Sequence, residues 1–144
     1  MRIEPKAEII IVTGLSGAGR STCLKLLEDY NFEAIDNLPL TLMSNLFSPL
    51  ISNSETEPQK KIAVGVDPRT RGFSAQSLID TLDKLKLQKA KLYIVFLDCD
   101  TASLIRRFTE TRRKHPLAID RPVSDGIKTE RKLLDGVRRA ADFI

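Results

Sequence analysis

The chain has 144 residues, of which 42% are hydrophobic and 29% charged, and its formal net charge is +4. These proportions are ordinary for a soluble globular protein, and the length suits one domain over residues 1–144. Its longest hydrophobic runs have five or six residues and no apolar leader follows a charged start, so we expect neither a membrane span nor secretion.

Short hydrophobic runs alternate with helical patterns from the start of the chain. Residues 9–12 predict a buried strand because they are β-branched and lack a polar alternation. The next helix should turn inward a face made of Cys23, Leu26, Leu27 and Tyr30. A short strand over residues 33–35 and a helix that Pro39 begins come next, with the inner positions Leu42, Leu46 and Leu50. The polar stretch 52–58 predicts a surface loop.

The middle of the chain predicts a strand, a helix and another strand. Residues 62–66 form a third buried run that ends at Asp67, and residues 92–97 form a fourth that ends at Asp98. The helix between these strands should bury Leu78, Leu82 and Leu85, which recur at the spacing of one helical face.

Two further helices are predicted in the last third. Asp100 or Thr101 can cap the first, whose inner face should hold Leu104, Ile105 and Phe108. Ser124 should begin the second, with the inner positions Ile127, Leu134 and Val137. Phe143 and Ile144 resemble the start of a fifth strand, and because a chain seldom stops there we expect a longer protein.

This order of elements predicts an α/β fold. Parallel strands need crossover helices, and right-handed crossovers place helices on both faces of the sheet. We therefore expect three layers, α/β/α, around a mostly parallel sheet of about five strands, as in P-loop NTPases of the nucleoside-kinase type.

A phosphate-binding loop is predicted between the first strand and the first helix. Residues 14–21 match G-x-x-x-x-G-K-[ST], with Arg20 in the lysine position. Glycines let successive backbone N–H groups converge on an anion, and the helix start adds the positive end of its dipole. The residues predicted to hold ATP or GTP are Gly14, Leu15, Ser16, Gly17, Ala18, Gly19, Arg20, Ser21 and Thr22. Ser21 should offer its hydroxyl to Mg²⁺; the other interpretation is a glycine-rich turn without a ligand.

Arg20 is the departure from the motif. Lysine delivers a compact charge to the phosphates, whereas guanidinium is planar, wider and forked. Arginine keeps the attraction, so nucleotide affinity should survive, but catalysis depends on a placement that the wider group alters. We therefore predict binding with weak turnover, and Arg20 and Asp67 are the candidate catalytic residues.

Three acids stand at predicted strand ends: Asp36, Asp67 and Asp98. Ligands of open parallel sheets bind at this edge, and a P-loop protein needs one carboxylate there for Mg²⁺. We favour Asp67 and keep Asp98 as the rival, while a plain helix cap is the other interpretation of either acid. Arg69 and Arg71 could hold a second phosphate or a base, or form an exposed turn.

The last third of the chain is basic. Residues 101–144 contain eleven Lys and Arg against six Asp and Glu, which suits nucleotide phosphates or RNA, or else a solvated helical surface. A pair of stretches around His115 and Pro116 resembles the lid of small kinases and carries Arg106, Arg107, Arg112, Arg113 and Arg121. A surface cluster is the other interpretation. We expect His115, the sole histidine, to be an exposed loop residue.

Several stretches are more specific than the phosphate loop alone. They are residues 12–22 (VTGLSGAGRST), 34–39 (AIDNLP), 63–67 (AVGVD), 96–98 (FLD) and 109–118 (TETRRKHPLA). With them the chain resembles the RNase adapter protein RapZ family over nearly all of its 144 residues.

The resemblance implies a bacterial cytoplasmic protein that binds ATP and GTP with Mg²⁺. It implies an ATP site at Gly14–Ser21 and a GTP site at the segment Asp67, Pro68, Arg69 and Thr70. It also implies an adapter that presents a small regulatory RNA to an endoribonuclease. The RNA would bind a C-terminal domain that we expect to lie outside this chain, and the full-length protein could assemble as a homo-oligomer through that domain.

Three functional hypotheses follow. The first is a nucleotide-binding regulatory module with weak NTPase activity, which the family resemblance and Arg20 favour. The second is a small-molecule or nucleoside-monophosphate-type kinase, which the lid arginines favour and in which residues 36–39 would lie at the phosphate acceptor. The third is RNA binding by this domain itself, which only the basic last third supports.

Overall fold

The computed structural model describes residues 7–43, 45–46, 60–69, 73–86 and 90–144. Its strands and helices are β1 (Ala7–Gly14), α1 (Arg20–Asp29), β2 (Glu33–Ile35), β3 (Lys60–Gly65), α3 (Ala75–Lys86), β4 (Ala90–Leu97), α4 (Thr101–Glu110) and α5 (Val123–Ala140). Residues 40–43 and 45–46 are also helical. The predictions for Leu50, the loop 52–58, Thr70 and Arg71 fall outside the described residues.

The sheet has four strands in the order β2-β3-β1-β4, and every pairing is parallel. β1 lies in the middle, with Ile9 opposite Ile62 of β3 on one side and Leu92 of β4 on the other. The predicted fifth strand is present only as a bridge between Val95 and Phe143, whose carbonyl accepts from the Phe96 N–H at 2.9 Å. The predicted parallel sheet is thus confirmed, with four strands and one bridge in the described chain.

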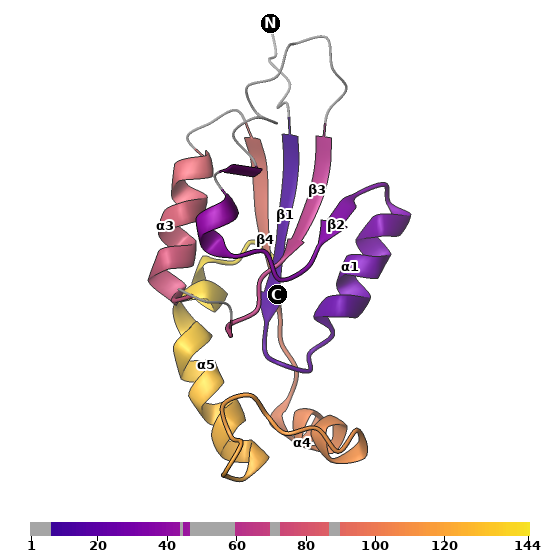
Figure 1. Ribbon diagram of the computed structural model, residues 1–144, viewed down its shortest axis with the longest axis vertical. Helices are drawn as coiled ribbons and strands as arrows, with labels where there is room; N and C mark the ends of the chain where they lie inside the picture. The colour runs from indigo at the N-terminus through magenta and orange to yellow at the C-terminus, as the bar shows by residue number, and fades with distance from the viewer. Residues whose placement is uncertain (1–6, 44, 47–59, 70–72, 87–89) are drawn as a thin grey trace, which may run out of the picture.

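Helices cover both faces of this sheet, which gives the three expected layers (Figure 1). Ile9 packs in a buried cluster with Leu82 of α3 and Leu134 of α5. On the opposite face Val12 packs with Leu24 of α1. Because burial of one such side chain contributes about 1.5–3 kcal/mol, the two clusters fix β1 between the helical layers.

The inner face of α1 differs from the predicted one. Leu24 is buried with Leu27 beside it, whereas Leu26 is 56% exposed and Tyr30 65% exposed. Leu26 is two positions from Leu24, about 200° around the helix, so both cannot face the sheet. Tyr30 lies beyond the last turn as the C-cap residue.

The helical segment after Pro39 is also rotated from its prediction. Leu40 and Met43 are buried and Leu46 packs against the main core, whereas Leu42 is 47% exposed. The pair at positions 40 and 43 sets the buried face because residues three apart lie on one side of a helix.

The remaining helices follow their predictions, except that α5 begins at Val123, one residue before the expected Ser124. Leu78, Leu82 and Leu85 of α3 are all buried. Asp100 caps α4 by accepting a hydrogen bond from the Ser103 N–H at 2.9 Å. Among the helices of the described chain, none combines the length and apolar character that crossing a bilayer requires.

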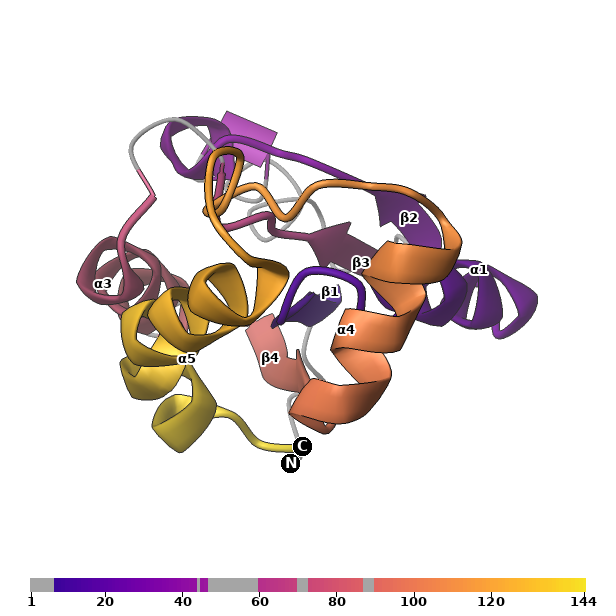
Figure 2. The same cartoon turned by 90° about the horizontal axis from the view of Figure 1, so that it is seen from below.

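The carboxyl ends of the strands meet the loop between β1 and α1. Seen from below, this loop lies between α4 and α5, which come from the far end of the sequence (Figure 2). Parallel strands bring all their carboxyl ends to one edge, so the loop and the acids after β2, β3 and β4 share that edge.

Candidate functional site

The phosphate loop has the backbone form that an anion site needs. Its strand side is held by a hydrogen bond from the Leu15 N–H to the Leu97 carbonyl at 3.1 Å. Gly17 and Gly19 have φ angles of 86° and 106°, a region that residues with a Cβ rarely adopt. Gly19 is the N-cap of α1 and makes no side-chain cap, so the first N–H groups of the helix have no intrahelical partner and remain for a ligand.

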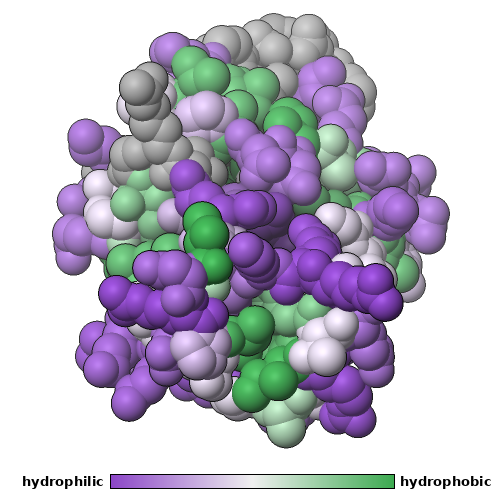
Figure 3. All heavy atoms as spheres, turned by 60° about the horizontal axis from the view of Figure 1, so that its bottom comes forward, coloured by the Kyte–Doolittle hydropathy of each residue, from purple (hydrophilic) through white to green (hydrophobic). Residues whose placement is uncertain are grey.

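A cavity of about 290 Å³ lies over the loop. Its lining residues are Leu15, Ser16, Gly17, Gly19, Arg20, Ser21, Thr22, Asp67, Arg69, Phe108, Arg113, Lys114 and Pro116. Figure 3 turns the loop end of the molecule toward the viewer, and hydrophilic residues predominate across the middle of this face. The cavity therefore brings the predicted ATP loop together with two residues of the predicted GTP segment, Asp67 and Arg69.

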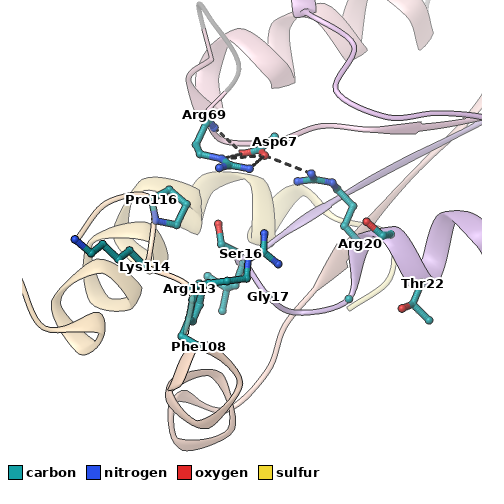
Figure 4. A pocket seen from close by; sticks show the side chains of 13 residues that line it. Ser16, Gly17, Arg20, Thr22, Asp67, Arg69, Phe108, Arg113, Lys114 and Pro116 are labelled. Atoms are coloured by element: carbon teal, nitrogen blue, oxygen red, sulfur yellow. Dashed lines mark hydrogen bonds and ion pairs between the residues drawn. The ribbon is translucent and has the colours of Figure 1, made fainter. Parts of the chain in front are cut away.

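Arg20 lies between two strand-end carboxylates. Its Nε is 3.1 Å from Asp36 Oδ1, and its terminal nitrogen NH2 is 3.3 Å from Asp67 Oδ2. Figure 4 shows the side chain reaching from α1 toward Asp67. Arg20, the residue in the lysine position, is therefore held at the carboxyl edge of the sheet by ion pairs with Asp36 and Asp67.

Asp67 is buried and saturated with donors. The carboxylate is 4% exposed and accepts from Arg69 NH2 at 2.6 Å and from the Arg69 backbone N–H at 2.8 Å. Burial acts to raise the pKa of Asp67, but the hydrogen bonds of Arg69 and the charge of Arg20 outweigh it and hold this pKa below its usual value. Asp67 is therefore an ionised group at the cavity wall.

Asp98, the rival carboxylate, is directed elsewhere. Its oxygens pair with Arg131 at 3.0 Å and with Arg138 at 3.3 Å, both from α5. The sequence pattern alone does not distinguish Asp67 from Asp98 as the metal carboxylate, because β3 and β4 both lie next to β1. The structure places Asp67 in the cavity lining and ties Asp98 to α5.

The basic segment between α4 and α5 reaches the cavity in part. Arg113, Lys114 and Pro116 line it, and the Arg107 terminal nitrogen NH1 donates to the Gly17 carbonyl at 2.7 Å. The other predicted lid arginines, Arg106, Arg112 and Arg121, are not among the residues that line the cavity. Arg106 donates to Ser103, and Arg121 lies beside Asp120.

His115 is buried, so the prediction of an exposed loop residue is wrong. Its side chain is 0% exposed and its ring centroid lies 5.1 Å from that of Phe108. Gly126 of α5 leaves room for it, since an added Cβ there would lie 2.7 Å from the ring carbon Cγ. The segment after α4 folds back over the core at this point and carries the imidazole inward.

Glu130 was not predicted as a site residue. It is 1% exposed and accepts from the Ser16 N–H at 2.6 Å and from the Ser16 hydroxyl at 2.7 Å. The sequence does indicate that Glu130 is buried, because it stands between Ile127 and Leu134 at an inward position of α5. A charged residue at such a position needs a buried partner.

Burial of His115 should make stability depend on pH. Its pKa is lowered because burial disfavours the charged imidazole more than Glu130 favours it. The unfolded chain then binds the proton more readily, so stability is fully present above about pH 6.5 and falls as the pH drops below it. We expect the free energy of unfolding to decrease by about 1 kcal/mol from pH 7.5 to 5.5 in urea denaturation.

His115 is the single histidine of the chain, so one substitution removes the histidine contribution to the pH dependence. His115→Gln should flatten the dependence in this pH range, where carboxylates titrate little. An equal slope in both proteins would show that another group is responsible.

The fold and the cavity define a class of protein. A central β1, a glycine loop and a helix start beneath a cavity form the phosphate-loop arrangement of the three-layer P-loop kinases and NTPases. The chain belongs to the RapZ-like N-terminal domain family, whose model matches residues 7–144.

Curated relatives agree over the same region. A nucleotide-binding protein of Zymomonas mobilis is 45% identical over 141 residues, which are 97% of this chain and 44% of that protein. A nucleotide-binding protein of Jannaschia sp. is 47% identical over 141 residues, 97% of this chain and 42% of that protein. The chain thus spans less than half the length of these relatives.

The fold is similar to that of a solved kinase. The structure of shikimate kinase from Acinetobacter baumannii in complex with shikimate aligns with a TM-score of 0.62 over 96% of this chain and 83% of that one. The two sequences are 14% identical, so the similarity concerns the fold alone.

Proposed function

We propose that this chain binds ATP at residues 14–22 and GTP at the segment 67–70. The proposal extends to a role as the nucleotide-binding part of a cytoplasmic RNase adapter with weak NTPase activity. The supporting observation is the loop itself: two glycines with positive φ lead to an uncapped helix start that faces the cavity. The names of the relatives, which describe nucleotide-binding proteins, agree with it.

The lining residues suit different parts of the ligand. The N–H groups at the start of α1 would hold the phosphates together with the side chain of Arg20. Asp67, Pro68, Arg69 and Thr70 are proposed to contact GTP; of these, Asp67 and Arg69 line the cavity, and Thr70 lies outside the described residues. Because the cavity over the phosphate loop also includes Asp67 and Arg69 of the GTP segment, ATP and GTP should compete for it.

Magnesium suits the oxygen donors of the lining. The Ser21 hydroxyl and the Asp67 carboxylate, the proposed metal ligands, belong to the donor types that Mg²⁺ prefers. When bound, the ion would neutralise phosphate charge. Asp67 would then exchange a hydrogen bond from Arg20 or Arg69 for the metal, which the exposed Arg69 can accommodate most easily.

Slow hydrolysis follows from the position of Arg20. In hydrolysis, water adds to the terminal phosphorus and the bond to the nucleoside diphosphate breaks. A cation must then meet the charge that develops on the phosphoryl oxygens. Arg20 is committed to Asp36 and Asp67, so it has to leave two ion pairs before it can serve the phosphoryl group.

The adapter role concerns the longer protein. The small regulatory RNA and the endoribonuclease are proposed to bind a part of the relatives that lies beyond the matched region, since this chain covers 44% of one relative and 42% of another. Nucleotide binding in this domain would then regulate that part.

The direct test is an NMR titration of the ¹⁵N-labelled chain with Mg-ATP or Mg-GTP. We expect the amides of residues 14–22 to shift, because the unpartnered N–H groups at the start of α1 would bond phosphate oxygens and the rest of the loop lies beside the added charge. Amides of the distant helix α3 should stay in place. Unmoved loop amides at millimolar nucleotide would refute the proposal.

A small-molecule kinase is the second candidate. The similarity of fold to shikimate kinase and the closeness of Asp36 to Arg20 favour it. A panel of nucleosides, nucleotides, sugars and hydroxy acids with labelled ATP would decide between the two. Phosphorylation of any acceptor at about 1–100 per second, the range of kinases, would establish the kinase instead.

A further inference from the structure

A buried carboxylate lies directly behind the phosphate loop. Glu130 accepts from both the backbone N–H and the hydroxyl of Ser16, at 2.6 and 2.7 Å. Charge-assisted hydrogen bonds of this length are strong, and they direct the Ser16 N–H toward α5. The loop is therefore bonded to a buried anion that is not itself part of the cavity lining.

His115 completes this arrangement. Its Nδ1 accepts from the Leu117 N–H at 3.0 Å, so the proton of the neutral ring is on Nε2. Nε2 faces Glu130 Oε1 at 3.6 Å and has no hydrogen-bond partner in the described chain. Phe108 on one side and Gly126 on the other fix the ring. The donors around Glu130 suit its ionised form, which is an acceptor only.

Arg69, the cation whose charge is shown to act on Glu130, is already paired, since its guanidinium is bonded to Asp67 at 2.6 Å. Arg20 pairs with Asp67 as well. Glu130 therefore keeps an electrostatic effect on the loop that no direct ion pair among the described residues cancels.

The terminal phosphate of a bound nucleotide would lie within reach of the negative charge of Glu130. In a P-loop the helix start holds the inner phosphates, and the side chain in the lysine position reaches the outer ones. Arg20 reaches toward Asp67, and Ser16 lies across the cavity from the pair of Asp67 and Arg69 (Figure 4). A third phosphate would thus come next to Ser16, with the carboxylate of Glu130 behind it.

We propose that Glu130 is a specificity-determining residue that makes the site favour nucleoside diphosphates over triphosphates, with His115 as the positioning residue that holds it. This rests on the proposed nucleotide site. The Glu130 carboxylate and the third phosphate are both negative, and little water lies between them at Ser16. Their repulsion is therefore stronger than in bulk water, and it weakens the binding of a triphosphate. The diphosphate, which lacks that group, is bound without the penalty.

The test compares the dissociation constants of Mg-ADP, Mg-ATP, Mg-GDP and Mg-GTP at one ionic strength by calorimetry. In the wild-type chain each diphosphate should bind more tightly than its triphosphate. Glu130→Gln keeps an oxygen for the Ser16 N–H but removes the charge, so the ratio of triphosphate to diphosphate Kd should fall about tenfold. Glu28→Gln, the same change on an exposed residue of α1, should leave the ratio unaltered.

Gly126→Ala tests the part of His115 without changing a group near the ligand. The added methyl group displaces the imidazole, so the ratio should move toward that of Glu130→Gln while the diphosphate affinity changes little. An unchanged ratio would remove His115 from the proposal.

The outcomes separate this proposal from the one on which it rests. A ratio that stays constant in Glu130→Gln, or an equal loss of affinity for both ligands, would leave nucleotide binding in place and assign Glu130 a structural role only. Triphosphates bound more tightly than diphosphates by the wild-type chain would also overturn it, with no variant needed. A wild-type chain that binds none of the four nucleotides would refute the nucleotide site itself.

Discussion

Replacing Gly14 with alanine should lower the free energy of unfolding by about 3–5 kcal/mol. Gly14 has a φ of 143°, and an added Cβ would overlap the carbonyl oxygen of Leu97 and lie 2.7 Å from its nitrogen. These are backbone atoms of β4, held by parallel pairing to β1, so they cannot move aside as a flexible side chain would. Urea denaturation followed by circular dichroism measures the loss.

Two glycines of the same chain serve as controls. Gly19→Ala meets no atom within 4 Å, so only its φ of 106° is costly, and the loss should be about 1–2 kcal/mol. Gly136→Ala, in the middle of α5, makes ordinary contacts of 3.6 and 4.0 Å and should stabilise the chain by up to about 1 kcal/mol. Equal effects at Gly14 and Gly19 would contradict the close approach to β4.

Loss of the Arg20 side chain should weaken the binding of Mg-ATP by about 10- to 100-fold. A hydrogen bond to a charged group contributes about 1.5–3 kcal/mol, and each 1.4 kcal/mol is a factor of ten in affinity. Arg20→Ala removes that bond to the phosphates, whereas Asp67 keeps Arg69 as a partner and the fold should persist. Calorimetry measures the affinity, and Arg106→Ala, which removes an exposed charge on α4, should leave it unaffected.

Arg20→Lys separates affinity from turnover. Lysine restores the compact charge of the usual motif, so the affinity should stay within a few-fold of the wild-type value while hydrolysis becomes faster. A hydrolysis rate equal to that of the wild type would mean that the guanidinium is not the cause of slow turnover.

Local patterns in the sequence were enough to predict the sheet and the loop. A β-branched run followed by glycines and a helical pattern needs only neighbouring residues to be recognised, which is why β1, the loop and α1 are predicted between residues 9 and 30. The rotation of α1 was missed because both Leu24 and Leu26 are hydrophobic, and packing against Val12 decided between them.

The buried pair behind the loop could not be predicted in the same way. His115 and Glu130 become neighbours only when the segment after α4 crosses α5, and Gly126 makes that crossing possible. In sequence, His115 precedes a proline in a basic stretch, which indicates a surface turn. The different surroundings of Asp67 and Asp98 likewise depend on arginines of α5, which are more than thirty residues from Asp98.

The central place of β1 gives the loop a rigid side and a compliant side. The Val12 carbonyl accepts from the Val66 N–H at 2.9 Å, and Leu15 donates to Leu97 across the other edge, so the strand that enters the loop is clamped from both sides. Beyond Ser16, which Glu130 holds, the chain passes through Gly17 and Gly19 to helix α1, which packs against one face of the sheet. Amide hydrogen exchange should therefore be slowest in β1 and become faster within a few residues after it. A bound ligand should slow exchange most in the part of the loop that leads into α1.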